Sequence, residues 1–130
     1  MKHDAKSRLE KEFASQIARY KLPEPVREFP FAREAFGRRY RLDFYWDAYK
    51  LGVELHGLIV LQGGIVRGGH GTVPGMTRDM DKKNAAILLG IDVLTFTQSH
   101  VTSHAAIQMT MRALTVKGLR WNDAPTHAQA

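Results

Sequence analysis

The stretch RLDFYWDAYKLGVELHG, residues 41–57, decides the fold of this chain. Its segments 41–46 and 51–55 are rich in aromatic and branched residues, and a short polar connection separates them, which predicts a β-hairpin. Apolar residues alternate with one acid in each strand, Asp43 in the first and Glu54 in the second. Because successive side chains of a strand point to opposite faces, both acids oppose the core-facing residues, and Glu54 shares its face with His56.

The length of the connection decides whether the two acids meet. An even number of loop residues, such as a four-residue loop at 46–49, places Asp43 and Glu54 on one face as diagonal neighbours, about 7 to 8 Å apart. An odd number places them on opposite faces. At such a distance two carboxylates share one divalent cation, and a hard cation such as Mg²⁺ prefers oxygen ligands, polarises a phosphate and lowers the pKa of an attacking water.

The two acids also have a purely structural interpretation. In this alternative, Asp43 pairs with Arg39 or Arg41, and Glu54 pairs with Lys50, as solvent-facing ion pairs across the strands. Exposed pairs of this kind contribute at most about 1 kcal/mol each and imply no chemistry. The pattern of residues alone leaves both interpretations open.

Upstream of the hairpin, the sequence predicts one helix and one strand. Apolar residues recur at helical spacing over 4–21, and LPEP at 22–25 ends this helix because the residue before a proline is pushed out of helical conformation. Alternating residues at 26–32 predict a short strand. Since Pro30 cannot donate a ladder hydrogen bond, we expect this strand at an edge of the sheet.

Downstream of the hairpin, residues 56–75 contain 7 of the 11 glycines and predict a long loop with room for a further short hairpin. Further expected elements are a helix at 78–89 with Thr77 and Gly90 as its caps, a strand at 91–97, and a helix at 100–116 capped by Ser99. We therefore expect one α/β domain at 1–117, with a central mixed β-sheet flanked by helices, and a polar C-terminal tail at 118–130.

The composition excludes several classes of protein. The 130 residues, 44% of them hydrophobic and 25% charged, are typical of one soluble globular domain. No apolar run approaches the roughly 20 residues of a membrane span, so we expect no membrane partner and a cytoplasmic protein. Because the chain has no cysteine, disulfides, thiol nucleophiles and cysteine-based zinc sites are excluded.

The positive charge is concentrated in the first third of the chain. Residues 1–41 hold 11 of the 19 basic residues and 6 of the 13 acidic ones, and the remainder is nearly neutral. An excess confined to one part favours a surface for a polyanion, and we expect DNA as the partner. Lys82 and Lys83 also stand at pairing distance from Asp79 along a helix, which is the structural alternative for them. The candidate DNA contacts are Arg38, Arg39, Arg41, Arg78, Lys82 and Lys83.

Several short motifs follow one another in order along the chain. They are a helix with Glu10, LPEP at 22–25, RLDF at 41–44, VELHG at 53–57, His70, Gly75, a helix with Asp79, Lys82 and Asn84, and GIDVLTF at 90–96. In this order the motifs resemble the PD-(D/E)XK nuclease superfamily, and more narrowly the small Vsr-like endonuclease domains of bacterial and phage genomes. The resemblance runs from about residue 9 to residue 97.

The resemblance implies a restriction-endonuclease-like core and a metal site. The ligands it implies are Asp43, Glu54 and the backbone carbonyl of Leu55, with Glu10 as a further acid. Glu10 is preferred to Glu12 because helical geometry places it about 60° from the centre of the apolar face, whereas Glu12 lies about 100° away.

The last position of the family signature departs from the usual pattern, because His56 stands where lysine is common. A lysine there would stabilise the developing phosphate charge and orient the attacking water. We expect either that His56 acts as a general base or neutral donor, or that Lys82 supplies the positive charge from the neighbouring helix. His70, among glycines that let a backbone approach a phosphate, is a further catalytic candidate.

The resemblance implies a Mg²⁺-dependent DNA endonuclease, with Mn²⁺ as a substitute, that hydrolyses phosphodiester bonds of branched or mismatched DNA. A Holliday junction resolvase would act as a homodimer, since two symmetric nicks need two sites, whereas a Vsr-like nickase would act as a monomer. The missing lysine favours a different alternative, which is a non-catalytic nucleic-acid-binding module on a degenerate nuclease fold.

Overall fold

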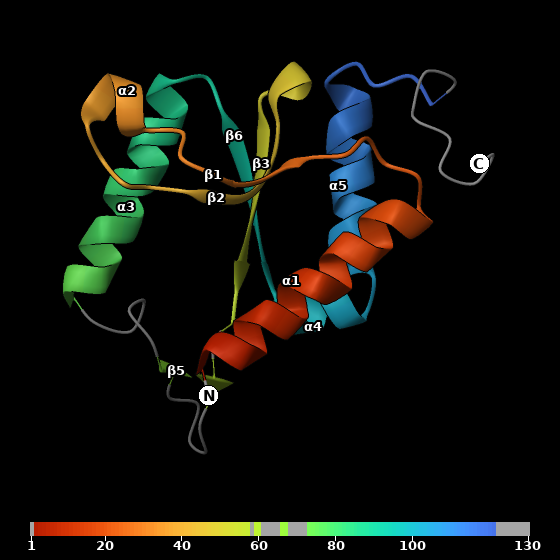
Figure 1. The fold of residues 1–130 in the computed structure, drawn as a ribbon, viewed down its shortest axis with the longest axis horizontal. Helices are drawn as coiled ribbons and strands as arrows, with labels where there is room; N and C mark the ends of the chain where they lie inside the picture. Colours follow the sequence, from red (N-terminus) through yellow and green to blue (C-terminus); the bar gives the residue numbers. More distant parts are fainter. Residues whose placement is uncertain (1, 58, 61–65, 68–72, 122–130) are drawn as a thin grey trace.

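The fold is that of a computed structural model, in which residues 2–57, 59–60, 66–67 and 73–121 are described (Figure 1). In chain order the elements are α1 (Lys2–Arg19), β1 (Val26–Phe29), α2 (Arg33–Phe36), β2 (Leu42–Trp46), a 3₁₀ turn (Asp47–Tyr49), β3 (Leu51–His56), β4 (Ile59–Val60), β5 (Val66–Arg67), α3 (Val73–Leu88), β6 (Asp92–Thr97), α4 (Gln98–Thr102) and α5 (Ala105–Val116).

Four strands form one mixed sheet in the order β1-β2-β3-β6. β1 pairs antiparallel with β2, β2 pairs antiparallel with β3, and β3 pairs parallel with β6. The expected hairpin, the edge position of the first strand and the α/β class with a central mixed sheet are therefore confirmed. β4 and β5 form a separate antiparallel pair, which is the short hairpin for which the segment 56–75 had room.

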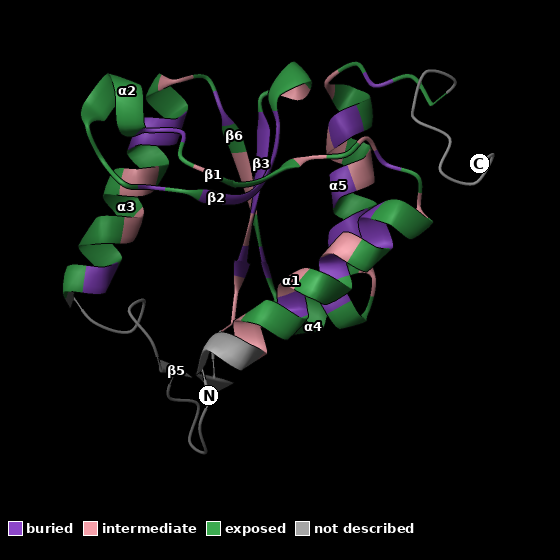
Figure 2. Ribbon diagram, viewed as in Figure 1, coloured by how far each residue is buried: buried purple, intermediate pink, exposed green. Residues whose placement is uncertain are grey.

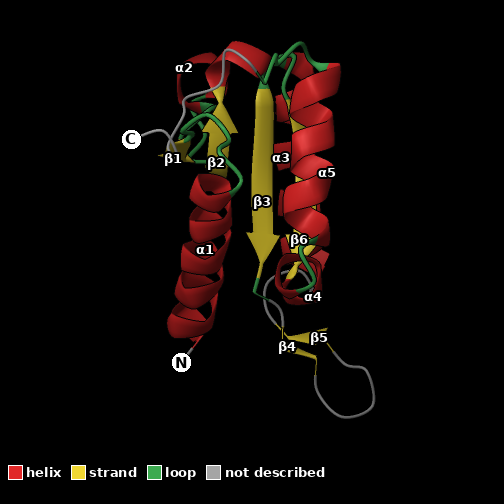
Figure 3. Cartoon of the chain, turned by 90° about the vertical axis from the view of Figure 1, so that its right-hand side faces the viewer, coloured by secondary structure: helices red, strands yellow, loops and turns green. Residues whose placement is uncertain are grey.

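Helices cover both faces of this sheet, so the molecule has three layers (Figure 1). On one face, α1, α4 and α5 bury their apolar sides against β2, β3 and β6, with Phe13 of α1 packed edge-on against Phe44 of β2. On the other face, α3 and the residues that flank α2, such as Phe31, form a second cluster with Tyr45 and Ile91. Figure 3 shows β3 between α1 and α5, and Figure 2 shows buried residues concentrated in the central strands.

Two boundaries in the first half of the chain differ from the expectation. β1 ends at Phe29 rather than at residue 32, and the chain then forms the one-turn helix α2, which the sequence analysis did not predict. Gly37 ends α2 with a φ of 62°, a left-handed conformation that glycine adopts without strain.

α3 begins five residues earlier than expected, at Val73 instead of residue 78. Pro74 and Gly75 look like helix breakers, but proline is tolerated in the first turn because the missing N–H has no helical partner there. Thr77 therefore lies inside the helix rather than at its N-cap.

The helix expected at 100–116 is in fact two helices. Thr97 caps α4, since its side chain and that of His100 form a capping box, so the expectation for Ser99 was wrong. His104 then adopts a φ of 69° and separates α4 from α5. Leu119 is buried in the core, so packing continues beyond the boundary expected at residue 117. Residues 122–130 of the expected tail, and His70, lie outside the described residues.

Candidate functional site

The two acids of the hairpin meet where its two strands stop pairing. Paired residues run from Trp46 and Leu51 to Phe44 and Val53, so the connection is a four-residue loop at 47–50. This is the even number that the sequence interpretation required, although the loop lies one residue later than in the example and the two acids turn to helices on opposite faces of the sheet. If the register is continued by one residue, Asp43 stands opposite Glu54 rather than diagonal to it.

Beyond the last paired residues, the acid side chains bind the neighbouring backbone. The N–H of Asp43 donates to Oε2 of Glu54 over 3.2 Å, and the N–H of Leu55 donates to Oδ2 of Asp43 over 2.7 Å. Asp43 is buried, with only 3% of its surface exposed. Both carboxylates are therefore held at defined positions by the backbone of the central strands.

Lys6 of α1 is the cationic partner of Asp43, at 3.2 Å between Nζ and Oδ1. Partial burial by itself lowers the pKa of Lys6, but the charge and hydrogen bond of Asp43 outweigh it, and the net pKa is raised. α1 packs closely against Gly57 at the end of β3: a Cβ on Gly57 would lie 3.2 Å from Cβ of Lys6 and 3.3 Å from its Cα. Glycine at position 57 thus lets the first helix pack against the end of β3.

Asp43 belongs to a cluster of three acids. One carboxylate oxygen each of Glu10, Glu28 and Asp43 lies within 4.8 Å of the others. Glu28 comes from β1 and has a φ of 53°, whereas Glu10 comes from α1 and is paired with Arg27 at 3.0 Å. Burial, followed by the repulsion of Asp43, raises the pKa of Glu10. The cluster is therefore drawn from three separate elements, α1, β1 and β2.

Glu54 lies next to this cluster but is paired differently. Its Oε1 accepts a hydrogen bond from Nζ of Lys82, which reaches it from α3. Burial is the largest influence on Glu54 and raises its pKa; the charge of Lys82 opposes this shift, and the charge of Asp43 adds to it. Of the ligands implied by the family resemblance, Glu54 is thus turned to Lys82, and the N–H of Leu55 is bound to Asp43.

Lys6, Glu28, Asp43, Glu54 and Lys82 line one cleft of about 330 Å³ at the open end of the hairpin, whereas Glu10 is not among its lining residues. Arg38 is not among the lining residues, and its guanidinium lies over the ring of Tyr40 at 4.9 Å. Lys83 is not among them either; it lines a neighbouring hollow beside α3 and β6 and a small cavity that Glu54 and Lys82 also line. The lining residues are Lys6, Glu28, Arg39, Tyr40, Arg41, Asp43, Glu54, Leu55, His56, Arg78, Asp79 and Lys82.

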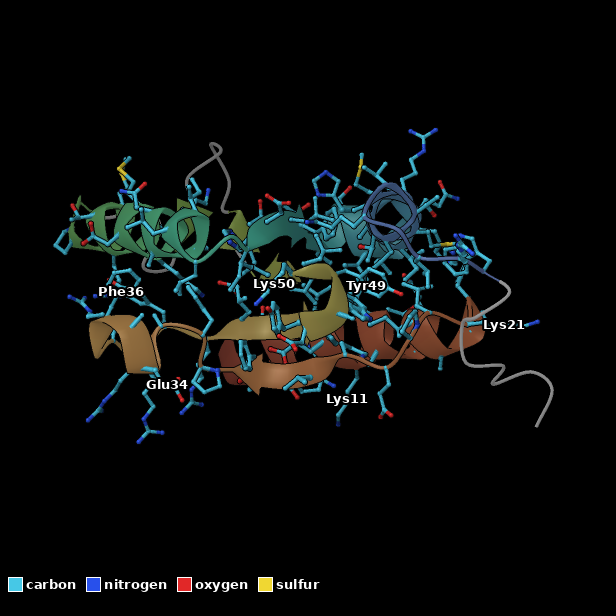
Figure 4. All side chains as sticks on the ribbon, turned by 90° about the horizontal axis from the view of Figure 1, so that it is seen from above. Lys11, Lys21, Glu34, Phe36, Tyr49 and Lys50 are labelled. Atoms are coloured by element: carbon cyan, nitrogen blue, oxygen red, sulfur yellow. The ribbon has the colours of Figure 1, made fainter. Side chains whose placement is uncertain are left out.

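The structural alternative for the two acids is correct only in that both form ion pairs, because Asp43 is buried and both partners come from helices rather than from across the strands. Asp43 and Glu54 do form ion pairs, but their partners are Lys6 and Lys82. Lys50 lies at the closed end of the hairpin (Figure 4), about 13 Å along β3 from Glu54 at 3.3 Å per residue.

Sequence reasoning missed Lys6 and Glu28. Lys6 precedes Glu10 by four residues, so both lie on one side of the helix, and this spacing was a usable signal. Glu28 has no such signal, because only the pairing of β1 with β2 brings it opposite Asp43. Glu12, the rejected alternative to Glu10, accepts a hydrogen bond from Gln16 instead of joining the cluster.

Comparisons with protein-family models, with curated proteins and with solved structures found no match to this chain. Among the residues that the structure describes, no helix combines the length and the apolar character that a membrane span requires. The residues of the cleft therefore provide the basis on which a function can be assigned.

Proposed function

We propose that this chain is a metal-dependent DNA endonuclease with a restriction-endonuclease-like core, and that the cleft at the open end of the hairpin is its active site. The observation that carries the proposal is the acidic cluster of Glu10, Glu28 and Asp43, because two of its members, Glu28 and Asp43, line a cleft that basic side chains also line. Acids that gather beside a polyanion-binding surface are repelled by their substrate unless a cation lies between them.

The donor set of the cluster fits a hard divalent cation. Glu10, Glu28 and Asp43 offer only carboxylate oxygens, the ligand type that Mg²⁺ and Mn²⁺ prefer, with no thiolate and no imidazole among them. When bound, such an ion polarises a phosphate and lowers the pKa of an attacking water. This ligand set differs from the one implied by the family resemblance, since Glu28 replaces Glu54.

The other residues of the cleft have distinct roles in this proposal. Arg39 and Arg41 on one wall and Arg78 on α3 bind phosphate groups of the DNA backbone. Lys82, whose Nζ donates to Glu54, moves its hydrogen bond to a phosphate oxygen and supplies the charge of the missing lysine. Glu54, whose pKa is raised by burial, then accepts a proton from the attacking water at its carboxylate.

His56 and Lys6 complete the set. His56 lines the same cleft at the end of β3 and is the second candidate for the general base. Lys6 pairs with the buried carboxylate of Asp43 in the absence of substrate and offsets its charge.

The test is cleavage of labelled DNA. A panel of plain duplex, mismatched duplex and four-way junction is incubated with the protein and Mg²⁺ or Mn²⁺, beside samples with a chelator. We expect cleavage that requires the divalent ion and favours branched or mismatched DNA. A protein that cuts no member of the panel under any divalent ion, or that cuts equally well with the chelator, contradicts the proposal.

One observation favours a second candidate function. Lys6 and Lys82 already pair with Asp43 and Glu54, so the charges of these two acids are balanced without a metal ion. A non-catalytic DNA-binding module would keep this arrangement. It would bind DNA with a strong salt dependence, without a divalent ion and without cleavage.

A further inference from the structure

The two outer strands of the sheet differ in how they protect their free edges. β1 has only four residues, carries the charges of Arg27 and Glu28, and lies between Pro25 and Pro30. A short strand, charged side chains and flanking prolines all discourage a further strand from pairing with this edge. β6 has six residues, Asp92–Thr97, and after its first residue it contains no charge and no proline. Among the described strands, none pairs with its outer edge. Natural proteins rarely leave such an edge uncovered.

An apolar stripe runs along the exposed side of α3, close to this edge. Met76, Met80 and Ile87 are separated by four and seven residues, so they lie on one side of the helix. They are 47%, 57% and 72% exposed, and the neighbouring Leu88 is 74% exposed. A helix that packs only against its own sheet has no reason to turn apolar residues outward in this way.

The stripe meets the free edge at Ile87, because a groove of about 320 Å³ is lined by Ile87 of the stripe together with residues of β6. Its walls are largely apolar, and its two charged residues, Lys83 and Asp92, have opposite signs. We name this surface the α3/β6 face. The groove is lined by Lys83, Ala86, Ile87, Ile91, Asp92, Val93 and Thr95.

We propose that the α3/β6 face binds a second copy of this chain, with the two β6 strands paired antiparallel about a two-fold axis. A free strand edge presents alternating N–H and C=O groups, and an identical strand running the other way satisfies them. The two sheets then form one continuous sheet, and the stripes of the two α3 helices lie next to each other. A two-fold interface of this kind uses the same face on both copies.

The charges of the face support a second copy as the occupant. Antiparallel pairing sets Asp92, at the start of one strand, near Thr97, at the end of the other, so the two Asp92 residues are kept apart. Asp92 is already paired with Lys117 at 2.6 Å, so each copy brings one acid and two basic residues, Lys83 and Lys117, and the residual charge of the joined faces is low. An anionic lipid surface or a nucleic acid would require an excess of basic residues, which this groove lacks.

The pairing also leaves the cleft accessible. Arg78 and Lys82, which line the cleft, lie on the side of α3 turned away from the stripe of Met76, Met80 and Ile87, at 100° per residue. Each copy therefore keeps its own open cleft.

The test measures the mass of the protein in solution, without DNA or metal ion, so its outcome is independent of the proposed nuclease activity. At roughly 100 μM, sedimentation equilibrium of the wild type is expected to give twice the chain mass of 14.7 kDa. Ile87→Glu places a charge in the middle of the apolar interface and is expected to weaken the dimer about tenfold or more. Met80→Glu, on the same stripe, is expected to act in the same direction.

The matched control is Met109→Glu, because Met109 is also an apolar helical residue, 47% exposed, and lies on α5 outside the residues that line the groove. It is expected to dimerise like the wild type. Circular dichroism and thermal unfolding identify which of the two α3 variants are folded, and the comparison uses those. A wild type that stays at 14.7 kDa at every concentration overturns the proposal, as does a dimer that folded α3 variants leave intact or that Met109→Glu weakens equally.

Discussion

The two ends of the β2–β3 hairpin are built from the same pair of strands but are used differently. At the closed end, Trp46 and Leu51 pair through the backbone and are buried among apolar side chains. At the open end, the buried positions hold Asp43 and the partly buried Glu54, whose carboxylates bind backbone N–H groups and lysines. The closed end stabilises the fold. At the open end, burial raises the pKa of Glu54. Acids with shifted pKa values are typical of functional sites.

The largest effect that separates the two roles is expected from Phe44→Ala. Phe44 is fully buried and contacts Phe13 at 5.0 Å between ring centroids, so its truncation is expected to lower the free energy of unfolding by about 3 to 5 kcal/mol. Phe36→Ala is the control, because Phe36 is 42% exposed on α2 (Figure 4), and it is expected to change stability little. Urea unfolding measures both. A loss below about 1 kcal/mol for Phe44→Ala would show that the paired part of the hairpin does not support the fold.

A pair of glycine substitutions sharpens the comparison, because each end of the hairpin has one glycine in close contact. A Cβ on Gly52 would lie 2.7 Å from a methyl group of Leu42, and a Cβ on Gly57 would press against the backbone of Lys6. Gly52→Ala and Gly57→Ala are each expected to lower stability by about 1 to 3 kcal/mol.

The two glycine variants are expected to differ in their effect on the cleft. Gly57→Ala moves Lys6 away from Asp43, so the pKa of Lys6, which this contact raises, is expected to fall, whereas Gly52→Ala leaves it unchanged. NMR titration of the lysine ammonium groups distinguishes them. Equal pKa values in both variants would mean that Gly57 does not position α1 at the cleft.

The smallest expected effect concerns pH. Burial raises the pKa of both Glu10 and Glu54 above 4.5, so between pH 4.5 and the raised values the folded chain binds more protons than the unfolded chain. The free energy of unfolding therefore falls as pH rises through this window. Glu54→Gln is expected to flatten the slope, and Glu34→Gln, on α2 outside the cleft, is expected to keep it. Urea unfolding at several pH values from about 4 to 7 checks this, and an unchanged slope in Glu54→Gln would contradict it.

Most of the fold was predictable because it follows from local patterns. Alternating residues at 41–46 and 51–55 indicate the hairpin, and apolar spacing over 4–21 indicates α1. The errors occurred where local signals are ambiguous. Pro74 and Gly75 can begin a helix as well as end one, and the break at His104 depends on a left-handed backbone at a residue type that rarely adopts it.

The site was predictable only in part, because its contacts join distant elements. Asp43 and Glu54 lie in the hairpin and could be paired by counting loop residues. Lys82 lies 28 residues from Glu54 and Glu28 lies on another strand, so both contacts depend on how the layers assemble. The ion pairs with Lys6 and Lys82 likewise follow from tertiary packing, which no short spacing in the sequence encodes.

One matched pair of acids tests the central claim most directly, since Asp43 and Asp47 lie at opposite ends of β2. Asp47 follows Trp46 in the turn at the closed end, outside the cleft, and accepts a hydrogen bond from Tyr45. The measurement is the rate of divalent-ion-dependent DNA cleavage by Asp43→Asn and Asp47→Asn. The account predicts that Asp43→Asn slows cleavage about a hundredfold or more and that Asp47→Asn cleaves at the wild-type rate. Equal rates for Asp43→Asn and the wild type would contradict it.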